Sequence, residues 1–326
     1  MNRRLFDLTI VVPTYNGEKY ILETLESITK QDVLPAEVIV VDDGSKDRTL
    51  ELASSADRLG LNTQIIRMAT NSGGPAGPIN IGIERARSKW IYVLDQDDLM
   101  SDRSVRTLAA ISTRYPNIEV IGGRVERFVD SSSNFDVPER VLSYWPDDFP
   151  VSKEDTWILP RGSICFLFEK GMVLNGFPGL YFTKAAWKKV GMLDESFRLA
   201  ADFDFLLRLT TNYSIYISKE VIYKYRFHGS SVTRNRSLLL LEDLRAKLGN
   251  YLKATGTLQA QMQPYVLQSA HKAYYWSREA RRYEISRESI QAMSILGESF
   301  LTRFRLCVFL HLHSMISHLP TRKNLG

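Results

Sequence analysis

Cysteine is scarce in this chain. Its 326 residues include only two, Cys165 and Cys307, which lie far apart and match no metal-ligating or redox spacing. A disulfide framework is therefore excluded as the main source of stability. The 44% apolar and 24% charged residues are typical of a globular protein with an ordinary core. Because so few cysteines fit a reducing compartment, we expect a cytoplasmic protein.

Long uncharged apolar runs are missing as well. Behind the arginines of residues 1–9 no apolar stretch is long enough for a signal peptide, so we expect the chain to stay inside the cell. Residues 300–319 are apolar but contain Arg303 and Arg305, and no window reaches the roughly 18 uncharged residues of a spanning helix. Two alternatives stay open for this segment: an amphipathic helix at the inner face of an anionic membrane, or a helix that packs on its own domain or forms a homodimer.

Basic residues are concentrated in the last third of the chain. Residues 234–326 contain fourteen Lys and Arg against six Asp and Glu, a local excess of +8, whereas the whole chain carries +5. Such an excess fits binding to nucleic acid, to anionic lipid or to an acidic partner protein, and it also fits an ordinary solvated helical face. The basic residues form no recognisable motif with interleaved aromatic residues, so we expect no nucleic-acid partner.

Short apolar runs alternate with helical patterns in the first part of the chain. Runs rich in β-branched residues predict strands at residues 8–12, 37–41, 64–67 and 90–94, and amphipathic stretches between them predict helices. This order is typical of right-handed strand–helix–strand units and of a mostly parallel sheet. The strands are apolar almost throughout, which indicates a sheet covered on both faces.

The remainder of the chain has a weaker pattern. Residues 130–149 are polar and irregular and predict a long surface loop, whereas residues 181–227 predict further strands and helices. From about residue 234 the strand signals stop and long helical periodicity follows. We therefore expect a change of domain near this position.

Polar clusters follow three of the predicted strands directly. They are residues 13–16 after the first strand, Asp42-Asp43 after the second and residues 95–98 after the fourth. In a parallel sheet, ligands bind outside the carboxyl ends of the strands, where the strand order reverses. Three clusters at one edge predict a single site.

The run Asp95-Gln96-Asp97-Asp98 is the strongest chemical signal. Carboxylates two residues apart at a strand end can reach one hard divalent cation such as Mg²⁺ or Mn²⁺. That cation would polarise a diphosphate as a leaving group. The structural alternative is an Asp-rich turn that caps the next helix.

The first two strand ends supply candidates for nucleotide binding. Tyr15 could stack on a base, although packing on the surface or in the core would explain this residue equally well. Asp42 and Asp43 could accept hydrogen bonds from a base or a ribose, or could cap a helix.

Two further candidates lie in the second half. Asp202 and Asp204 open a predicted helix; a carboxylate aimed into the cleft could act as a general base, whereas Asp204 and Arg208 could form a stabilising i,i+4 pair. His228 follows an aromatic strand pattern and could bind metal or phosphate, although a lone histidine is more often structural.

Several segments together resemble the family 2 inverting glycosyltransferases of GT-A fold. They read IVVPTYNGEKYILETLESITKQ, EVIVVDDGSKDRT, NIGIERARSKWIYVLDQDD and LYFTKAAWKKVGMLDESFRLAADFDFLLRL, and the resemblance ends near YRFHGSSVT. It implies a GT-A nucleotide-sugar-binding fold with a mostly parallel central sheet over residues 1–233, divided into a nucleotide-binding half (1–115) and an acceptor half (116–233). A basic helical C-terminal region would follow over residues 234–326.

The resemblance also implies a role for each matching residue. The implied sites are the nucleotide-binding residues Pro13, Tyr15, Asp42, Asp43 and Asp95, the metal ligands Asp97, Asp98 and His228, and the catalytic base Asp202. The sequence departs from the family pattern in two places. Ile79 stands where many relatives have an Arg, and Ala201 stands where an acidic residue often precedes the base, so the donor sugar stays open.

The activity implied by the resemblance is metal-dependent sugar transfer with Mn²⁺ or Mg²⁺ as cofactor. The donor would be UDP-, dTDP- or GDP-linked, the acceptor a glycan or lipid-linked hydroxyl, and the process polysaccharide or glycan biosynthesis. One alternative is a non-catalytic sugar-nucleotide-binding or scaffold protein of the same fold. Another is a nucleotidyltransferase, for which residues 13–17 lack the basic, Gly-rich phosphate loop.

Overall fold

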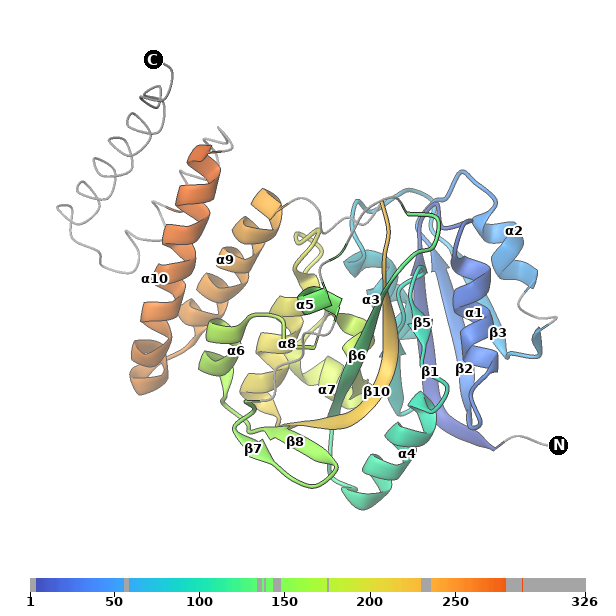
Figure 1. Ribbon diagram of the computed structural model, residues 1–326, viewed down its shortest axis with the longest axis horizontal. Coiled ribbons are helices and arrows are strands. Elements are labelled where there is room, and N and C mark those ends of the chain that lie inside the picture. Colours follow the sequence, from blue (N-terminus) through green and yellow to red (C-terminus); the bar gives the residue numbers. More distant parts are fainter. Residues whose placement is uncertain are drawn as a thin grey trace, which may run out of the picture. The chain divides into compact units, whose positions relative to one another are not determined.

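The chain forms two compact units, Met1–Arg234 and Asn235–Gly326 (Figure 1). The computed structural model describes residues 4–55, 59–133, 137, 139–142, 148–174, 176–229, 236–279 and 289. The first unit contains the sheet, and the described part of the second contains the helices α9 (Arg236–Lys253) and α10 (Gly256–Glu279). The expected nucleotide-binding and acceptor halves of the first unit stay a prediction.

Within the described residues, a ten-stranded sheet forms the core of the first unit, in the order β3-β2-β1-β4-β9-β6-β10-β8-β7, with β5 pairing with β10 off this path. The strands are β1 (Leu5–Thr14), β2 (Leu34–Asp42), β3 (Thr63–Arg67), β4 (Trp90–Val93), β5 (Leu99–Met100), β6 (Val120–Val129), β7 (Val151–Ser152), β8 (Thr156–Leu159), β9 (Leu180–Thr183) and β10 (Ile215–Phe227). Neighbours pair in parallel along β3-β2-β1-β4 and between β6 and β10, whereas β9 is antiparallel to β4 and β6. The prediction of a sheet that is mostly parallel in its core is confirmed.

Helices cover both faces of this sheet. They are α1 (Ile21–Thr29), α2 (Thr49–Ser54), α3 (Ala76–Arg85), α4 (Ser104–Arg114), α5 (Glu139–Leu142), α6 (Ile164–Lys170), α7 (Lys184–Val190) and α8 (Ala201–Asn212), with a 3₁₀ turn at Phe177–Gly179. The apolar stripe of α1 and the buried side of α4 share one core with Leu8, Ile10 and Val12 of β1. Val11, which points to the opposite face, contacts α3 at Gly82. Because both faces are covered, β1 is buried from Leu8 to Thr14.

The strand order reverses at β1, and this reversal positions the candidate site. Strands β2 and β3 extend the sheet on one side of β1, and β4 lies on the other. The parallel ladder places Thr14 beside Asp42, and the backbone N–H of Leu94, just after β4, donates to the carbonyl of Val11 at 3.0 Å. The turns after β1, β2 and β4 therefore open at the same edge, as expected for a ligand site in such a sheet.

The sequence pattern does not predict β6. Gly122 and Gly123 interrupt its apolar run, and sequence periodicity gives no reason for two consecutive glycines inside a strand. The structure explains them by close packing, because a Cβ at Gly123 would lie 2.5 Å from Cγ2 of Ile222 on the neighbouring β10. Strand β6 completes the sheet between β9 and β10.

The second unit is helical where it is described. Lys247 of α9 donates to the hydroxyl of Ser269 on α10 at 3.0 Å and pairs with Asp243 at 3.1 Å. In the described part of the chain, no helix combines the length and the apolar character needed to cross a bilayer. Residues 300–319 lie outside the described residues, so both alternatives for that segment stay predictions.

Substituting Gly82→Ala tests the contact between α3 and β1. A Cβ at this position would overlap Cγ1 of Val11, which is completely buried. We expect the free energy of unfolding to fall by about 1–3 kcal/mol, the usual cost of overpacking a core. Urea denaturation would measure this loss. Arg85→Ala, an exposed change on the same helix, serves as the control, and an equal midpoint for both variants would contradict the packing described here.

Candidate active site

The loops after β1 and β2 are joined by hydrogen bonds. The backbone N–H of Asn16 donates to the hydroxyl of Ser45 at 2.9 Å, and the N–H of Lys46 donates back to the Asn16 side-chain oxygen at 2.9 Å. The N–H of Gly17 donates to the hydroxyl of Thr49 at 2.7 Å. These bonds fix the loops as one surface, from which the ring of Tyr15 projects with 43% of the residue exposed.

The two aspartates after β2 bond mainly to the protein. Asp42 is completely buried; its carboxylate accepts hydrogen bonds from the Thr14 hydroxyl at 3.4 Å and the Ser45 N–H at 3.1 Å. Asp43 is 3% exposed and accepts from the Ser72 N–H at 2.8 Å, the Ser72 hydroxyl at 2.9 Å and the Asn71 amide at 3.0 Å. In this structure the two carboxylates shape the loops, and Asp43 keeps some acceptor capacity, since each of its oxygens has two lone pairs. Pro13 is buried within β1. The roles expected for these three residues in nucleotide binding stay predictions.

The acidic turn, residues 95–98, follows β4 and places its carboxylates in different environments. Asp97 is partly exposed, and its Oδ2 lies 2.7 Å from Nε2 of His228. Asp98 is 1% exposed, and its Oδ1 accepts the backbone N–H of Arg226 at 2.9 Å. Burial and the negative charges of Asp97 and Asp95 raise the pKa of Asp98 well above its ordinary value, against the opposing effect of Arg226. Asp98 therefore anchors the turn from below, while Asp97 lies toward His228.

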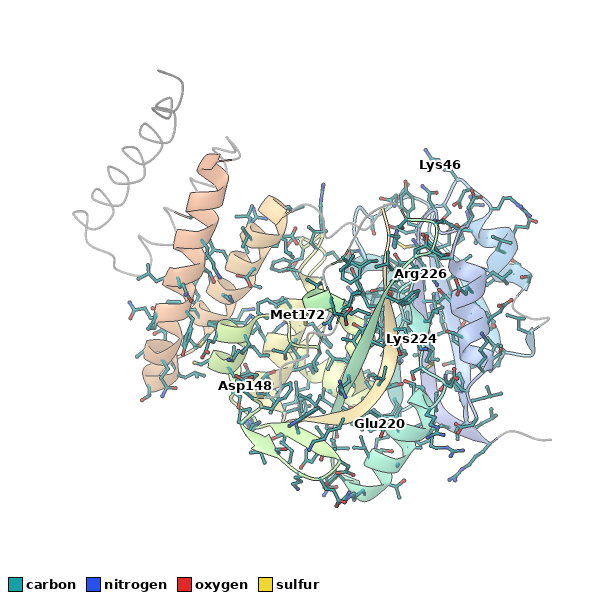
Figure 2. All side chains as sticks on the ribbon, in the orientation of Figure 1. Lys46, Asp148, Met172, Glu220, Lys224 and Arg226 are labelled. Atoms are coloured by element: carbon teal, nitrogen blue, oxygen red, sulfur yellow. The ribbon has the colours of Figure 1, made fainter. Side chains whose placement is uncertain are left out.

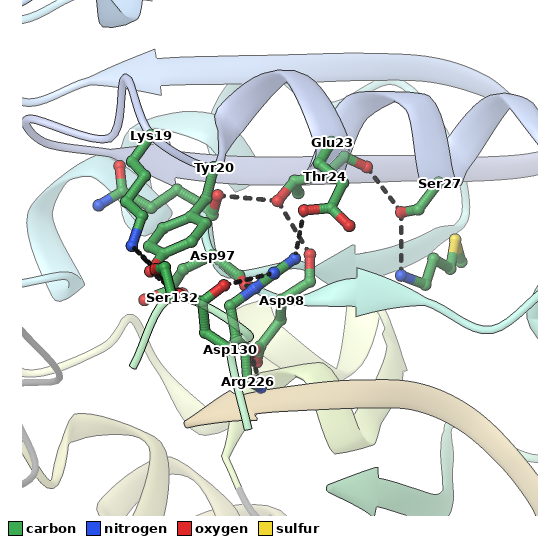
Figure 3. Close-up of polar contacts among 12 residues, drawn as sticks. Lys19, Tyr20, Glu23, Thr24, Ser27, Asp97, Asp98, Asp130, Ser132 and Arg226 are labelled. Carbon is green, nitrogen blue, oxygen red and sulfur yellow. Dashed lines mark hydrogen bonds and ion pairs between the residues drawn. The ribbon is translucent and has the colours of Figure 1, made fainter. Parts of the chain in front are cut away.

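Arg226 holds this turn in place, and sequence reasoning missed it. Figure 3 shows the guanidinium between Glu23 and Asp130, close to the acidic turn. It donates to the carbonyl of Asp97 at 2.8 Å and to Glu23 at 2.7 Å, and it lies 3.5 Å from Asp130. The rings of Tyr20 and Phe128 pack against it, each with its centroid 4.8 Å away.

One signal for Arg226 was present in the sequence. Arg226 and His228 are two residues apart near the end of β10, so their side chains lie on the same face of the strand. In Figure 2, Glu220, Lys224 and Arg226 mark the course of β10 toward the rim where the strand ends.

Thr24 fastens the turn to helix α1, and Asp130 binds the residues just before that helix. The hydroxyl of Thr24 lies 2.8 Å from the carbonyl of Gln96 and 2.9 Å from that of Asp98. Asp130, just after β6, accepts from Lys19 at 3.1 Å, from the Tyr20 hydroxyl at 3.2 Å and from Ser132. The hydrogen bonds from Ser132 and Lys19 hold the pKa of Asp130 below its ordinary value.

Asp202 and Asp95 belong to the same electrostatic cluster. Burial and the charges of Asp97 and Asp202 raise the pKa of Asp95 from 3.8 to about 8. Asp202 is half-buried at the start of α8, and its Oδ2 would lie 3.3 Å from a Cβ at Gly176, whose φ of +100° is available mainly to glycine. The structure thus brings Asp202 together with Asp95 and Asp97, which lie more than a hundred residues earlier in the chain.

Asp204, the other acidic residue at this helix start, has the structural role. It pairs with Arg208 at 2.8 Å, and Arg208 also donates to the carbonyls of Val190 and Gly191 at 2.8 and 2.9 Å. This pair is buried rather than exposed at the surface, because α7 packs against α8.

The donor set suits a divalent cation only in part. In the portion of the chain that the structure describes, no three His, Cys, Asp or Glu side chains are arranged as a metal-binding group. Asp97 and His228 supply a carboxylate oxygen and an imidazole nitrogen close together, and Asp95 adds a further carboxyl group nearby. Two protein ligands fit Mn²⁺ or Mg²⁺ at sites where substrate phosphates and water complete the coordination.

Known proteins similar to this chain include glycosyltransferases. The chain is 28% identical over 246 residues to an uncharacterized glycosyltransferase of Rickettsia typhi, which covers 76% of this chain and 71% of the relative. It is 39% identical over 108 residues to the poly(ribitol-phosphate) β-N-acetylglucosaminyltransferase TarS of Staphylococcus aureus, which covers 32% of this chain and 19% of TarS.

Two solved structures show a similar fold. The crystal structure of S. aureus TarS 1–349 in complex with UDP-GlcNAc matches with a TM-score of 0.57 and 20% identity over 90% of this chain and 93% of that one. The mannosyltransferase PcManGT of Pyrobaculum calidifontis, in complex with GDP-Man and Mn²⁺, matches with a TM-score of 0.52 and 15% identity over 96% and 81%. At these identities the likeness establishes the GT-A fold.

The family is established by a match that includes the strand-end clusters and the acidic turn. The model of glycosyl transferase family 2 matches residues 9–173, about half of the chain. This chain is therefore a glycosyltransferase and belongs to glycosyl transferase family 2.

Proposed function

We propose that this glycosyltransferase moves a sugar from a nucleoside diphosphate to an acceptor hydroxyl with inversion at the anomeric carbon. The observation that carries this proposal is the cluster of Asp95, Asp97 and Asp202, whose turn is joined through Gln96 to the backbone of the exposed Tyr15. Acidic groups that repel one another need a cation or a proton in their midst, and a nucleotide needs a flat apolar surface for its base. The site for a cation and the surface for a base both lie at the edge of the sheet where β1, β2 and β4 end.

Tyr15 and Asp43 form the proposed base-binding side. The exposed ring of Tyr15 offers a stacking face, and the free acceptor capacity of Asp43 suits an N–H of a base. TarS has been solved with UDP-GlcNAc and PcManGT with GDP-Man, so uracil and guanine nucleotides are the first donors to test. Asp42 bonds to Thr14 and Ser45 in the loops around the proposed base site, and Pro13 is buried near the end of β1, two residues before Tyr15.

Asp97 and His228 are the proposed metal ligands, with Asp95 close by. A bound Mn²⁺ or Mg²⁺ would neutralise the diphosphate and make it a better leaving group. Asp98 lies behind these ligands, and we propose that it acts by holding Arg226 and the turn in place.

Asp202 is the proposed catalytic base. The acceptor oxygen forms a bond to the anomeric carbon while the bond from that carbon to the diphosphate oxygen breaks. The hydroxyl proton passes to the carboxylate of Asp202, and the diphosphate leaves with the bonding electrons. A single displacement of this kind inverts the anomeric configuration. The acceptor would be a glycan or lipid-linked hydroxyl on the cytoplasmic side, with residues 234–326 contacting a membrane or a second copy.

Asp202→Asn separates transfer from binding. The amide keeps the shape of the side chain but cannot take the acceptor proton, so we expect the transfer rate to fall by about 10²–10⁴-fold with nucleotide affinity unchanged. Transfer assays with UDP- and GDP-sugars and Mn²⁺, together with calorimetric nucleotide titrations, measure the two effects. Asp102→Asn, an exposed change, is the matched control. Full turnover in the Asp202 variant would show that the base is another group, and a wild-type chain that binds nucleotide but transfers no sugar would favour the scaffold alternative.

Asp97→Asn and Asp98→Asn test which carboxylate binds metal. We expect a chelator to abolish transfer, and Asp97→Asn to raise the Mn²⁺ concentration for half-maximal activity by about tenfold or more. Asp98→Asn should leave this concentration unchanged, because Asp98 is buried with a raised pKa and an amide oxygen can still accept the Arg226 N–H. A Mn²⁺ titration of the transfer rate measures both. Equal shifts in the two variants would make Asp98 a ligand as well.

Asp95 should make the stability of the metal-free protein fall as the pH rises. Its pKa is about 8 in the fold against an ordinary 3.8, so between these values the folded chain holds a proton that the unfolded chain has released. The free energy of unfolding therefore decreases between these two pH values. Asp95→Asn removes this titration and is expected to raise the melting temperature more near pH 8 than near pH 5. A gain that is equal at both pH values would contradict the assigned pKa.

A further inference from the structure

The side chain of Gln96, the second residue of the acidic turn, pairs with the main chain of Tyr15. The backbone N–H of Tyr15 donates to Oε1 of Gln96 at 2.9 Å, and Nε2 of Gln96 donates to the carbonyl of Tyr15 at 3.0 Å. Both bonds require an amide, because a carboxylate has no N–H to donate and an ammonium group has no acceptor. The amide thus takes the place that a neighbouring strand would occupy beside Tyr15.

This pairing begins where the backbone ladder between β1 and β4 stops. The last paired residues are Val11 and Val93, followed by the bond from Leu94 to the carbonyl of Val11. Pro13 has no N–H and cannot continue such a ladder. Beyond this point the Gln96 amide provides hydrogen bonds between the turn after β4 and the loop after β1.

Gln96 is itself anchored, and the loop has room for it. Its carbonyl lies 2.8 Å from the hydroxyl of Thr24 on α1. A Cβ at Gly17 would overlap the Gln96 amide, and the three atoms nearest to such a Cβ all belong to Gln96. Gly17 has no positive φ, so the missing side chain at this position is explained by space for the amide.

We propose that Gln96 is a positioning residue that fixes the ring of Tyr15 for the nucleobase of the donor and links that ring to the metal-binding turn. This inference rests on the proposed function of Tyr15. Tyr15 is 43% exposed, and its backbone forms two hydrogen bonds with Gln96, so the position of the loop determines where the ring lies. Because Gln96 lies between Asp95 and Asp97 in the chain, the same turn sets the position of the base and of the diphosphate.

Gln96→Ala tests the proposal through the kinetic constants. Losing two hydrogen bonds that orient the ring should raise the donor KM by about tenfold. The value of kcat should change by less than about threefold, since Asp202 and the acidic side chains are untouched. Steady-state transfer assays, with UDP and GDP titrations as the binding measurement, give these values. Asn62→Ala, which removes an amide bonded to the Ala36 carbonyl at the opposite edge of the sheet, is the matched control and should change neither constant.

Gly17→Ala removes the pairing while Gln96 stays intact. The new methyl group would push the flexible amide away from Tyr15, so we expect the same rise of about tenfold in the donor KM. In the Gln96→Ala background the methyl group has room, and Gly17→Ala should then have almost no further effect. Such non-additivity is the signature of two residues that act through one contact.

Three results would overturn the proposal. The first is an unchanged donor KM in either single variant, and the second is additive effects in the double variant. The third is loss of folding in both single variants, which would mean that the amide acts only on stability. If the wild-type chain transfers sugar while Gln96→Ala shows wild-type kinetics, the inference fails and the proposed function stands. If the wild-type chain binds no nucleotide, both fail.

Discussion

Repulsion among carboxylates at one rim of the sheet is the constraint on which the site depends. Asp95, Asp97 and Asp202 come from two distant parts of the chain, yet their charges are close enough to raise the pKa of Asp95 to about 8. A fold gathers like charges only where another group compensates for them. A divalent cation and a charged substrate are the compensation that a glycosyltransferase would supply. The stability that this repulsion costs would be regained when the donor binds.

Arg226 brings a positive charge to the buried side of the acidic turn, where it opposes the raised pKa of Asp98. Its guanidinium is 5% exposed and contacts the carbonyl of Asp97 and the carboxylates of Glu23 and Asp130, while two aromatic rings pack on its faces. A buried charge is tolerated when it is paired and hydrogen-bonded in this way. Because the guanidinium of Arg226 holds the buried side of the acidic turn, the turn can keep acidic residues on its exposed side.

Polar side chains near a ligand site need not touch the ligand. Asp42 accepts hydrogen bonds from the loops around it, and Asp98 accepts the backbone N–H of Arg226 near the end of β10. The side chain of Gln96 pairs with the main chain of Tyr15, and neither of these two bonds involves a predicted ligand. In each case the burial of a side chain and its hydrogen-bond partners show whether it supports the site or is available to a substrate. The spacing of these residues in the sequence does not distinguish the two roles.

The amino-acid sequence by itself determined the order of β1 to β4 and of the helices between them, the parallel core of the sheet and the edge where the polar clusters meet. These follow from local periodicity and from the rule that parallel strands end together. Only the tertiary structure decided the rest: that β6 needs Gly122 and Gly123 to pass its neighbours, that Arg226 supports the acidic turn, and that Asp98 lies beneath it while Asp97 meets His228. Such features arise from contacts between residues that lie far apart in the chain, and local sequence patterns carry no information about those contacts.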